Sequence, residues 1–260
     1  MWLNDETAIY KRELFLEKPF INSAGTLGFA PDPHNMPFLS NLGAFITNPI
    51  SYKPRVPASN RTYLPYLGGF LLHTGHPNPG INRAIGRFKN RWAGAPLQVI
   101  VHLLVENPGT LAEMVRKLEG LENLMGVELG LPPDCSPQLL MDFMDAAFGE
   151  LPIILCLSPE QIPIFKEMLP ELNLSALHLI EPRGTLPDSK GELVTGRLYG
   201  PGIFPAMLTA AKRLIDTGLP MFVNGGIFDQ TQAKILLDMG VTAVGLGSVL
   251  WGHNPNKFSV

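Results

Sequence analysis

The chain has 260 residues, of which 45% are hydrophobic and 17% are charged, so it can bury a large core and is not intrinsically disordered. Its 20 basic and 23 acidic residues give a formal net charge of −3, and no overall positive charge favours binding to nucleic acid. Two cysteines are too few for a disulfide framework, no stretch has the roughly 18 apolar residues of a membrane span, and the N-terminus lacks a signal-peptide pattern. We therefore expect a cytoplasmic protein that binds neither membrane nor nucleic acid.

Eight short apolar runs, separated by segments of helical periodicity, are typical of the strands of a buried parallel sheet. In chain order they are Phe20–Ala24, Ala44–Thr47, Gln98–Leu103, Gly126–Leu129, Ile153–Leu157, Ala176–Ile180, Met221–Asn224 and Ala243–Leu246. Eight strands that alternate with helices predict a single α/β domain over residues 1–260, a closed (β/α)8 TIM barrel. An open doubly wound sheet is the alternative, which is disfavoured because no Gly-x-Gly-x-x-Gly follows the first strand.

Helix starts and ends are marked by residues that cap helices. Prolines follow serines at 136–137 and 158–159, and Gly218 and Gly240 end helical runs just before apolar strands. Three pairs have the spacing of a capping box: Thr110 with Glu113, Ser158 with Gln161, and Asp229 with Gln232.

Glycine-rich loops follow the last two predicted strands, as Asn-Gly-Gly-Ile at 224–227 and Gly-Leu-Gly-Ser at 245–248. Sites of barrel enzymes lie at the C-terminal strand ends, where bare backbone N–H groups and a helix N-terminus can bind a phosphate. For either loop alone, a tight turn is the alternative. Both loops together, with Gly200 ahead of a third helix, predict that a phosphorylated cofactor or metabolite binds the backbone of Gly200, Gly225, Gly226, Gly247 and Ser248.

Several segments, in their order and spacing, resemble the dihydroorotate dehydrogenase family of FMN-binding barrel flavoproteins. The matching segments are residues 22–29 (Asn-Ser-Ala-Gly-Thr-Leu-Gly-Phe), 42–47, 75–80 (Gly-His-Pro-Asn-Pro-Gly), 195–201 (Thr-Gly-Arg-Leu-Tyr-Gly-Pro), 225–227 and 247–248. The resemblance implies that FMN contacts Ala24, Gly25, Thr26, Asn48, His102, Cys156, Glu181, Gly200, Gly225, Gly226, Gly247 and Ser248.

The same resemblance implies an oxidoreductase of pyrimidine biosynthesis whose small-molecule substrate contacts Leu72, Asn78 and Pro133. It also implies that residues 52–96 form a loop excursion over the C-terminal mouth of the barrel. This segment holds seven basic residues and no acidic one, and they form either a solvated basic face, which is favoured, or a rim that attracts anions. A homodimer is compatible with the sequence.

The departures from the family pattern fall where the chemistry takes place. Cys156 and Asn48 stand where the family has lysines, and Leu72, His102 and Glu181 replace asparagines. The loop at 130–135 (Gly-Leu-Pro-Pro-Asp-Cys) replaces the family's segment with the base. Because losing a positioned charge or hydrogen-bond donor costs about a hundredfold or more in rate, we expect dihydroorotate oxidation to be weak or absent and the ligand to be less polar.

Two cysteines and a histidine are candidates for chemistry in the site. Cys135 follows the fourth strand and is either a general base or an ordinary loop cysteine, with Asp134 as an alternative acid or base. Cys156 lies in the middle of an apolar strand and is expected to be structural. His102 ends a strand and either hydrogen-bonds a ring or belongs to the core. No spacing along the sequence predicts a metal site.

Three functions are compatible with these features. The first is an FMN-dependent oxidoreductase related to dihydroorotate dehydrogenase, with an altered substrate site. The second is a non-catalytic relative that binds a phosphate or a flavin. The third, a lyase or isomerase, ranks last because no lysine lies at the end of a predicted strand.

Overall fold

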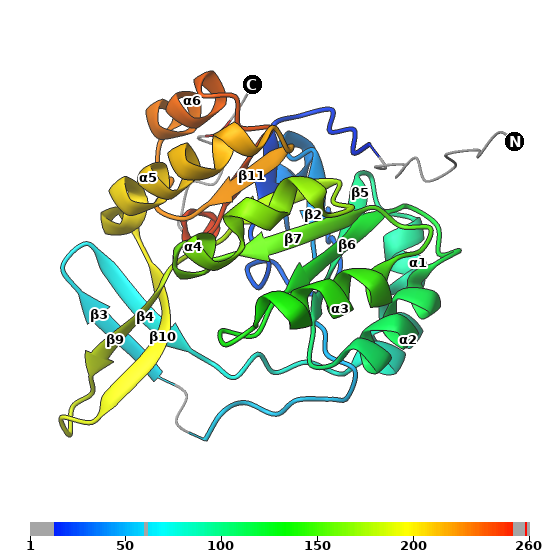
Figure 1. Ribbon diagram of the computed structural model, residues 1–260, viewed down its shortest axis with the longest axis horizontal. Helices are drawn as coiled ribbons and strands as arrows, with labels where there is room; N and C mark the ends of the chain where they lie inside the picture. Colours follow the sequence, from blue (N-terminus) through cyan, green and yellow to red (C-terminus); the bar gives the residue numbers. More distant parts are fainter. Residues whose placement is uncertain (1–12, 60–61, 252–257, 259–260) are drawn as a thin grey trace, which may run out of the picture.

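The computed structural model describes residues 13–59, 62–251 and 258, and eight parallel strands close a barrel within them (Figure 1). The predicted (β/α)8 barrel is confirmed, the open sheet is wrong, and every predicted strand is present with its ends within two residues of the expected positions. In barrel order the strands are β1 (Phe20–Asn22), β12 (Ala243–Leu246), β11 (Met221–Asn224), β8 (Ala176–Leu179), β7 (Ile153–Leu157), β6 (Leu124–Gly130), β5 (Gln98–Leu104) and β2 (Ala44–Ile46).

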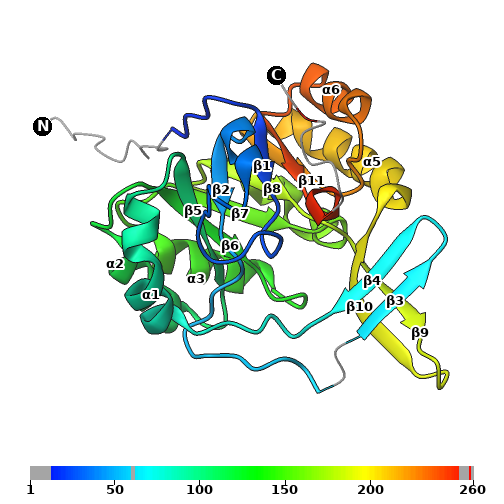
Figure 2. The same ribbon diagram turned by 180° about the vertical axis from the view of Figure 1, so that it is seen from behind.

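Helices cover the outside of the barrel (Figures 1 and 2). In α2, for example, Leu111, Met114, Val115 and Leu118 are buried, and their spacing of three or four residues places them on one side of the helix. The helices are α1 (Ile81–Ala93), α2 (Pro108–Leu118), α3 (Pro137–Ala147), α4 (Ile162–Phe165), α5 (Phe204–Leu214) and α6 (Gln230–Asp238). None of the helices in the described part of the chain is long and apolar enough to cross a membrane.

Two of the three predicted capping boxes are present, at Ser158 and at Asp229. The box at Thr110 is wrong, because α2 begins at Pro108 and Asn107 is its cap. The Asn107 side chain accepts a hydrogen bond from the N–H of Thr110 at 2.9 Å, so Thr110 lies in the first turn of the helix and not at its cap.

A four-stranded antiparallel sheet, which the sequence patterns did not predict, projects from the barrel (Figures 1 and 2). Hairpin β3–β4 comes from the segment expected to be a loop excursion, and that segment also contains α1. Hairpin β9–β10 connects barrel strand β8 with α5. The order across the sheet is β3 (Thr62–Tyr66), β4 (Gly69–His73), β10 (Leu193–Tyr199) and β9 (Arg183–Pro187).

The barrel interior is apolar at its N-terminal end and polar toward its C-terminal end. Ile100, Ile154, Ala176 and Phe222 belong to an apolar cluster to which all eight barrel strands contribute. Alternate residues of a strand point to the same face, so the side chains two positions further along also point inward. Those side chains are His102, Cys156, His178 and Asn224, which form a polar layer together with Glu128 of β6.

Candidate active site at the barrel mouth

A cavity of about 570 Å³ lies at the C-terminal mouth of the barrel. It is lined by residues that follow β1, β6 and β8, by the loop after β4, and by the inner end of the four-stranded sheet. Of the predicted cofactor and substrate residues, the cavity brings together Ala24, Gly25, Thr26, Leu72, His102, Pro133 and Glu181. This is the end of a barrel at which enzymes of this fold carry their sites.

A second, smaller cavity of about 10 Å³ adjoins the first, because Glu181 and Tyr199 line both. It brings together the predicted phosphate-binding residues Gly200, Gly225, Gly226, Gly247 and Ser248. We call these five residues the glycine cradle. At Gly226, φ is +77°, and an added Cβ would collide with the backbone nitrogen of Phe204, so a larger residue does not fit there.

The glycine cradle and the mouth cavity fit parts of a flavin nucleotide. The cradle brings the backbone of five residues to one small cavity. The amide of Asn224, which is 1% exposed and lines the mouth, has no hydrogen-bond partner among the described residues. The carboxylate of Glu181 restricts this fit, because it lies against the glycine cradle. Its Oε1 is 3.2 Å from the position that a Cβ on Gly247 would take. A cavity of about 10 Å³ has room for about one water, so a phosphate requires Glu181 to move aside.

Glu128 joins two histidines inside the polar layer. Its two carboxylate oxygens contact Nδ1 of His102, at 2.5 Å, and Nδ1 of His178. Glu128 and His178 are 0% exposed, and His102 is 5% exposed. The pairing of β5 with β6 places His102 directly opposite Glu128, so backbone register creates this contact.

The charges of this triad follow from its contacts. Burial of Glu128 would raise its pKa, but the positive charge of His178 and the hydrogen bonds from both imidazoles outweigh burial and lower the pKa. Burial of His178 would lower its pKa, but the charge and hydrogen bond of Glu128 outweigh burial and raise the pKa. Glu128 and His178 therefore form a buried ion pair.

The rim of the mouth cavity is cationic. Arg55, Arg183 and Arg197 line it, and the pairing of β9 with β10 places Arg183 opposite Arg197. Arg55 lies 3.8 Å from Glu106, whereas Arg183 and Arg197 form no salt bridge with any carboxylate of the described residues. Burial and the charge of Arg197 lower the pKa of Arg183, and the more distant charge of Glu160 offsets them only in part. The two guanidinium groups therefore lack a close counter-ion.

Asn48 and Asn78 belong to the loops and do not line the cavity. Oδ1 of Asn48 accepts a hydrogen bond from the N–H of Gly28 at 3.0 Å. Oδ1 of Asn78 accepts hydrogen bonds from the N–H groups of Ser51, at 3.1 Å, and Gly80, at 2.9 Å. Both asparagines shape loops, and the cofactor contact of Asn48 and the substrate contact of Asn78 stay predictions.

Neither cysteine lines the mouth cavity. Cys135 is 3% exposed and packs in the apolar core outside the barrel, and burial and the charge of Asp134 raise its pKa to about 11. Its position does not support the base role considered for it. Cys156 is 1% exposed, and burial and the charge of Glu128 raise its pKa well above the usual value. It is a buried thiol, in line with the structural role expected for it.

Sequence reasoning missed Glu128, His178, Arg183 and Arg197. A signal existed for the first two, because each is a single titratable residue within an apolar strand. The fold also brings Nδ1 of His102, a carboxylate oxygen of Glu128 and Sγ of Cys156 within 4.8 Å of one another, a metal-ligand set that linear spacing did not indicate.

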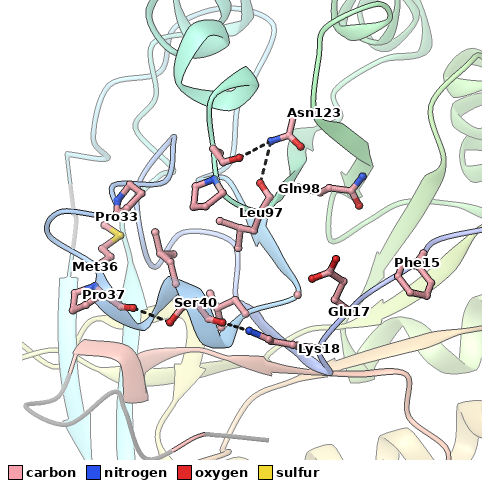
Figure 3. Close-up of a pocket in the computed structure, with 15 residues that line it drawn as sticks. Phe15, Glu17, Lys18, Pro33, Met36, Pro37, Ser40, Leu97, Gln98 and Asn123 are labelled. Carbon is pink, nitrogen blue, oxygen red and sulfur yellow. Dashed lines mark hydrogen bonds between the residues drawn. The ribbon is translucent and has the colours of Figure 1, made fainter.

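A further cavity, of about 580 Å³, opens at the opposite end of the barrel (Figure 3). Ser40, Gln98 and Asn123 line it near the N-terminal strand ends. The amide of Asn123 donates hydrogen bonds to the carbonyl oxygens of Ala95 and Leu97 at 3.4 and 3.1 Å. The Asn123 amide therefore holds the loop that precedes β5, and this end of a barrel serves stability rather than chemistry.

The chain is similar in sequence to proteins named dihydroorotate dehydrogenase. No protein-family model matches the chain. A dihydroorotate dehydrogenase B (NAD(+)) catalytic subunit from Pelobacter propionicus is 26% identical over 260 residues, covering 90% of this chain and 84% of that protein. A putative dihydroorotate dehydrogenase A (fumarate) from Pediococcus pentosaceus is 24% identical, covering 93% and 87%.

The fold has a counterpart among solved structures. The crystal structure of dihydroorotate dehydrogenase from Eimeria tenella in complex with ferulenol has a TM-score of 0.74 and 14% identity, and the match covers 91% of this chain and 77% of that one. Similarity along nearly the whole sequence to enzymes named dihydroorotate dehydrogenase, together with the shared barrel fold, supports membership of the dihydroorotate dehydrogenase family.

Proposed function

We propose that this protein is an FMN-dependent oxidoreductase of the dihydroorotate dehydrogenase type with an altered substrate site, and that its activity on dihydroorotate is weak or absent. The observation that carries the proposal is the convergence of the glycine cradle on one point beside the mouth cavity. The cradle would hold the FMN phosphate through backbone N–H groups. The amide of Asn224 and the backbone of Ala24, Gly25 and Thr26 would contact the rest of the cofactor in the mouth.

The bound flavin supplies the acceptor for a hydride. The protein's own residues bind the substrate, orient it and exchange protons with it. Relatives are named for dihydroorotate. In this chain Leu72 and Pro133 line the cavity, and Cys135, the candidate base, lies outside it. Since each missing positioned group costs about a hundredfold or more in rate, these changes support low activity on that substrate.

The substrate we propose is a small anion. The sequence alone predicts a less polar ligand, because Leu72, Pro132 and Pro133 stand where the family has polar residues. Arg183 and Arg197 change that expectation. Neither forms a salt bridge with a carboxylate of the described residues, and partly buried cations without close counter-ions favour a carboxylate ligand. Arg55, already beside Glu106, would add to the attraction from the rim.

Equilibrium binding of FMN and of riboflavin tests the cofactor site, because the two differ only in the phosphate. The wild-type protein should bind FMN at least about a hundredfold more tightly than riboflavin. Gly226→Val should abolish this preference, since its side chain would enter the backbone of Phe204. Gly247→Ala is a milder variant, because its Cβ would meet only the side-chain ends of Glu181 and Ser23 at 3.2 Å, and it should weaken FMN binding.

Gly86→Ala is the matched control, because a Cβ there has no neighbour within 4 Å and the residue lies inside α1. It should bind FMN like the wild type. Equal affinity for FMN and riboflavin in the wild-type protein would overturn the phosphate site. A protein that binds FMN but is reduced by no carboxylate substrate would favour the non-catalytic alternative.

A further inference from the structure

Three side chains with metal-binding atoms meet inside the polar layer, on three neighbouring barrel strands. They are His102 of β5, Glu128 of β6 and Cys156 of β7, and a ring nitrogen, a carboxylate oxygen and Sγ all lie within 4.8 Å of one another. Nδ1 of His102 lies 2.5 Å from Oε2 of Glu128 and 4.0 Å from Sγ of Cys156. Ligand atoms around a tetrahedral zinc ion lie about 3–4 Å apart. An ion therefore fits if the imidazole and the carboxylate move apart by about 1 Å.

The charges and donor types of the three groups suit a divalent transition metal. A carboxylate from Glu128 and a thiolate from Cys156, once the thiol has given up its proton, carry two negative charges that match one divalent ion. Buried charges in proteins are paired or coordinate metals, and both side chains are at most 1% exposed. Thiolate and imidazole donors favour zinc and similar metals over magnesium or calcium, which prefer oxygen.

The surrounding barrel holds two of the donors in place. Strand register places His102 directly opposite Glu128, and the backbone N–H of His102 donates a hydrogen bond to Oγ1 of Thr47 at 3.1 Å. The second carboxylate oxygen of Glu128 contacts Nδ1 of His178, so one oxygen is oriented while the other is directed at His102. Partners of this kind, which fix a ligand's orientation, are typical of metal sites.

An ion can reach this cluster from the mouth cavity. His102 and Gly130 both line that cavity, and Nε2 of His102 lies 2.5 Å from the position of a Cβ on Gly130. The glycine therefore leaves room for the imidazole at the base of the mouth. When a metal binds Nδ1 of His102, the hydrogen of the ring moves to Nε2, on the side of Gly130.

We propose that His102, Glu128 and Cys156 bind one zinc ion in the polar layer beneath the mouth cavity. The ion joins β5, β6 and β7, and its three protein ligands leave one position of a tetrahedral site for a water or a small anion. The bond to zinc replaces the contact between Nδ1 of His102 and Glu128. This site does not depend on FMN, so it stands or falls separately from the proposed function.

Titration of the chelator-treated protein with Co²⁺, followed by its absorption spectrum, tests the site. The wild-type protein should bind about one Co²⁺ per chain with a thiolate-to-cobalt charge-transfer band in the near ultraviolet, and Zn²⁺ should displace the ion and remove the band. Cys156→Ser should abolish the band. Since a change in a group that only orients a ligand costs about 10–100-fold in affinity, loss of this ligand should weaken binding about a hundredfold or more.

Two matched controls separate these ligands from the same residue types elsewhere. Cys135→Ala should keep the band, because Cys135 lies in the apolar core outside the barrel. His102→Phe should weaken Co²⁺ binding about a hundredfold or more, whereas His34→Phe, at an exposed position, should leave it unchanged. Zn²⁺ should also raise the Tm of the wild-type protein and not that of Cys156→Ser, since an ion that binds only the folded state stabilises it.

Three results would overturn the metal site. The first is a wild-type protein that shows no charge-transfer band with Co²⁺. The second is unchanged metal affinity in Cys156→Ser or in His102→Phe, because the ion would then lie elsewhere. The third is loss of the band in Cys135→Ala, which would assign the thiolate to the other cysteine. None of these results bears on FMN binding, which is measured by itself.

Discussion

Glu128→Gln should be among the most destabilising polar substitutions in this protein. The carboxylate is 0% exposed and contacts two imidazoles, of which His178 is also 0% exposed. Removing one partner of a buried ion pair costs about 3–5 kcal/mol, because the remaining charge is left without compensation. For a chain of this size, that loss corresponds to a decrease in Tm of roughly 10 °C.

The loss of stability in Glu128→Gln should depend on pH, and the pKa shifts of Glu128 and His178 set the direction of that dependence. The lowered pKa of Glu128 gives stability that is present above its ordinary value of 4.5 and is lost as pH falls through the folded value. The raised pKa of His178 gives stability that is present below its ordinary value of 6.5 and is lost as pH rises through the folded value. The two contributions coincide between pH 4.5 and 6.5. The difference between wild type and Glu128→Gln should be largest there and smaller at higher pH.

Urea unfolding of both proteins at pH 5.5 and at pH 8, about one unit inside and well above that window, measures the effect as a change in unfolding free energy. Glu119→Gln is the control, because Oε1 of Glu119 accepts a hydrogen bond from the N–H of Glu150 at an exposed position. It should cost less than about 1 kcal/mol. A Glu128→Gln protein as stable as the control, or a difference that grows toward pH 8, would refute the buried ion pair.

Three other substitutions have separate consequences. Glu181→Gln should tighten FMN binding about tenfold, because it removes a negative charge from the glycine cradle, and a decrease in affinity by calorimetry would contradict this. Arg183→Gln should weaken binding of orotate, used as a carboxylate probe and followed by the flavin spectrum, about tenfold or more, whereas unchanged affinity would remove Arg183 from the anion site. Cys135→Ala should leave the rate of flavin reduction by any substrate unchanged within about twofold, and abolished reduction would make Cys135 the base after all.

The barrel could be predicted from the sequence because its strands carry local signals. A run such as Ile153–Leu157 is buried on both sides, and its apolar composition alone marks it as a barrel strand. The caps at Ser158 and Asp229 are equally local, since each capping box spans four residues. The convergence of the glycine cradle was also predictable, because loops after neighbouring parallel strands meet at the same end of a closed barrel.

The four-stranded sheet could not be predicted in the same way. Strand β9 (Arg183–Pro187) contains a glycine and a proline and is partly exposed, so neither composition nor alternation marks it. Its partner β10 pairs with β4, more than a hundred residues away, and no local pattern reports such a pairing. Arg183 and Arg197 reach the mouth only through this sheet, and for that reason the sequence did not indicate their part in the cationic rim.

The buried triad was missed for a different reason. Glu128 and His178 lie within strands whose apolar neighbours alone mark them as buried, and the contact between them depends on which strands lie side by side in the barrel. Inward-facing side chains fill the barrel interior, so titratable residues that strand register places opposite each other predict a contact. His102 opposite Glu128 is such a contact.

The amount of FMN in the purified protein is the most direct test of the central claim. The protein should be denatured after incubation with excess FMN and removal of the free cofactor, and the released flavin should be counted for each chain by its absorbance. We expect about one FMN per chain in the wild type and none in Gly226→Val, because the valine would collide with Phe204 in the glycine cradle. A wild-type protein that retains no FMN under these conditions would contradict the proposed function.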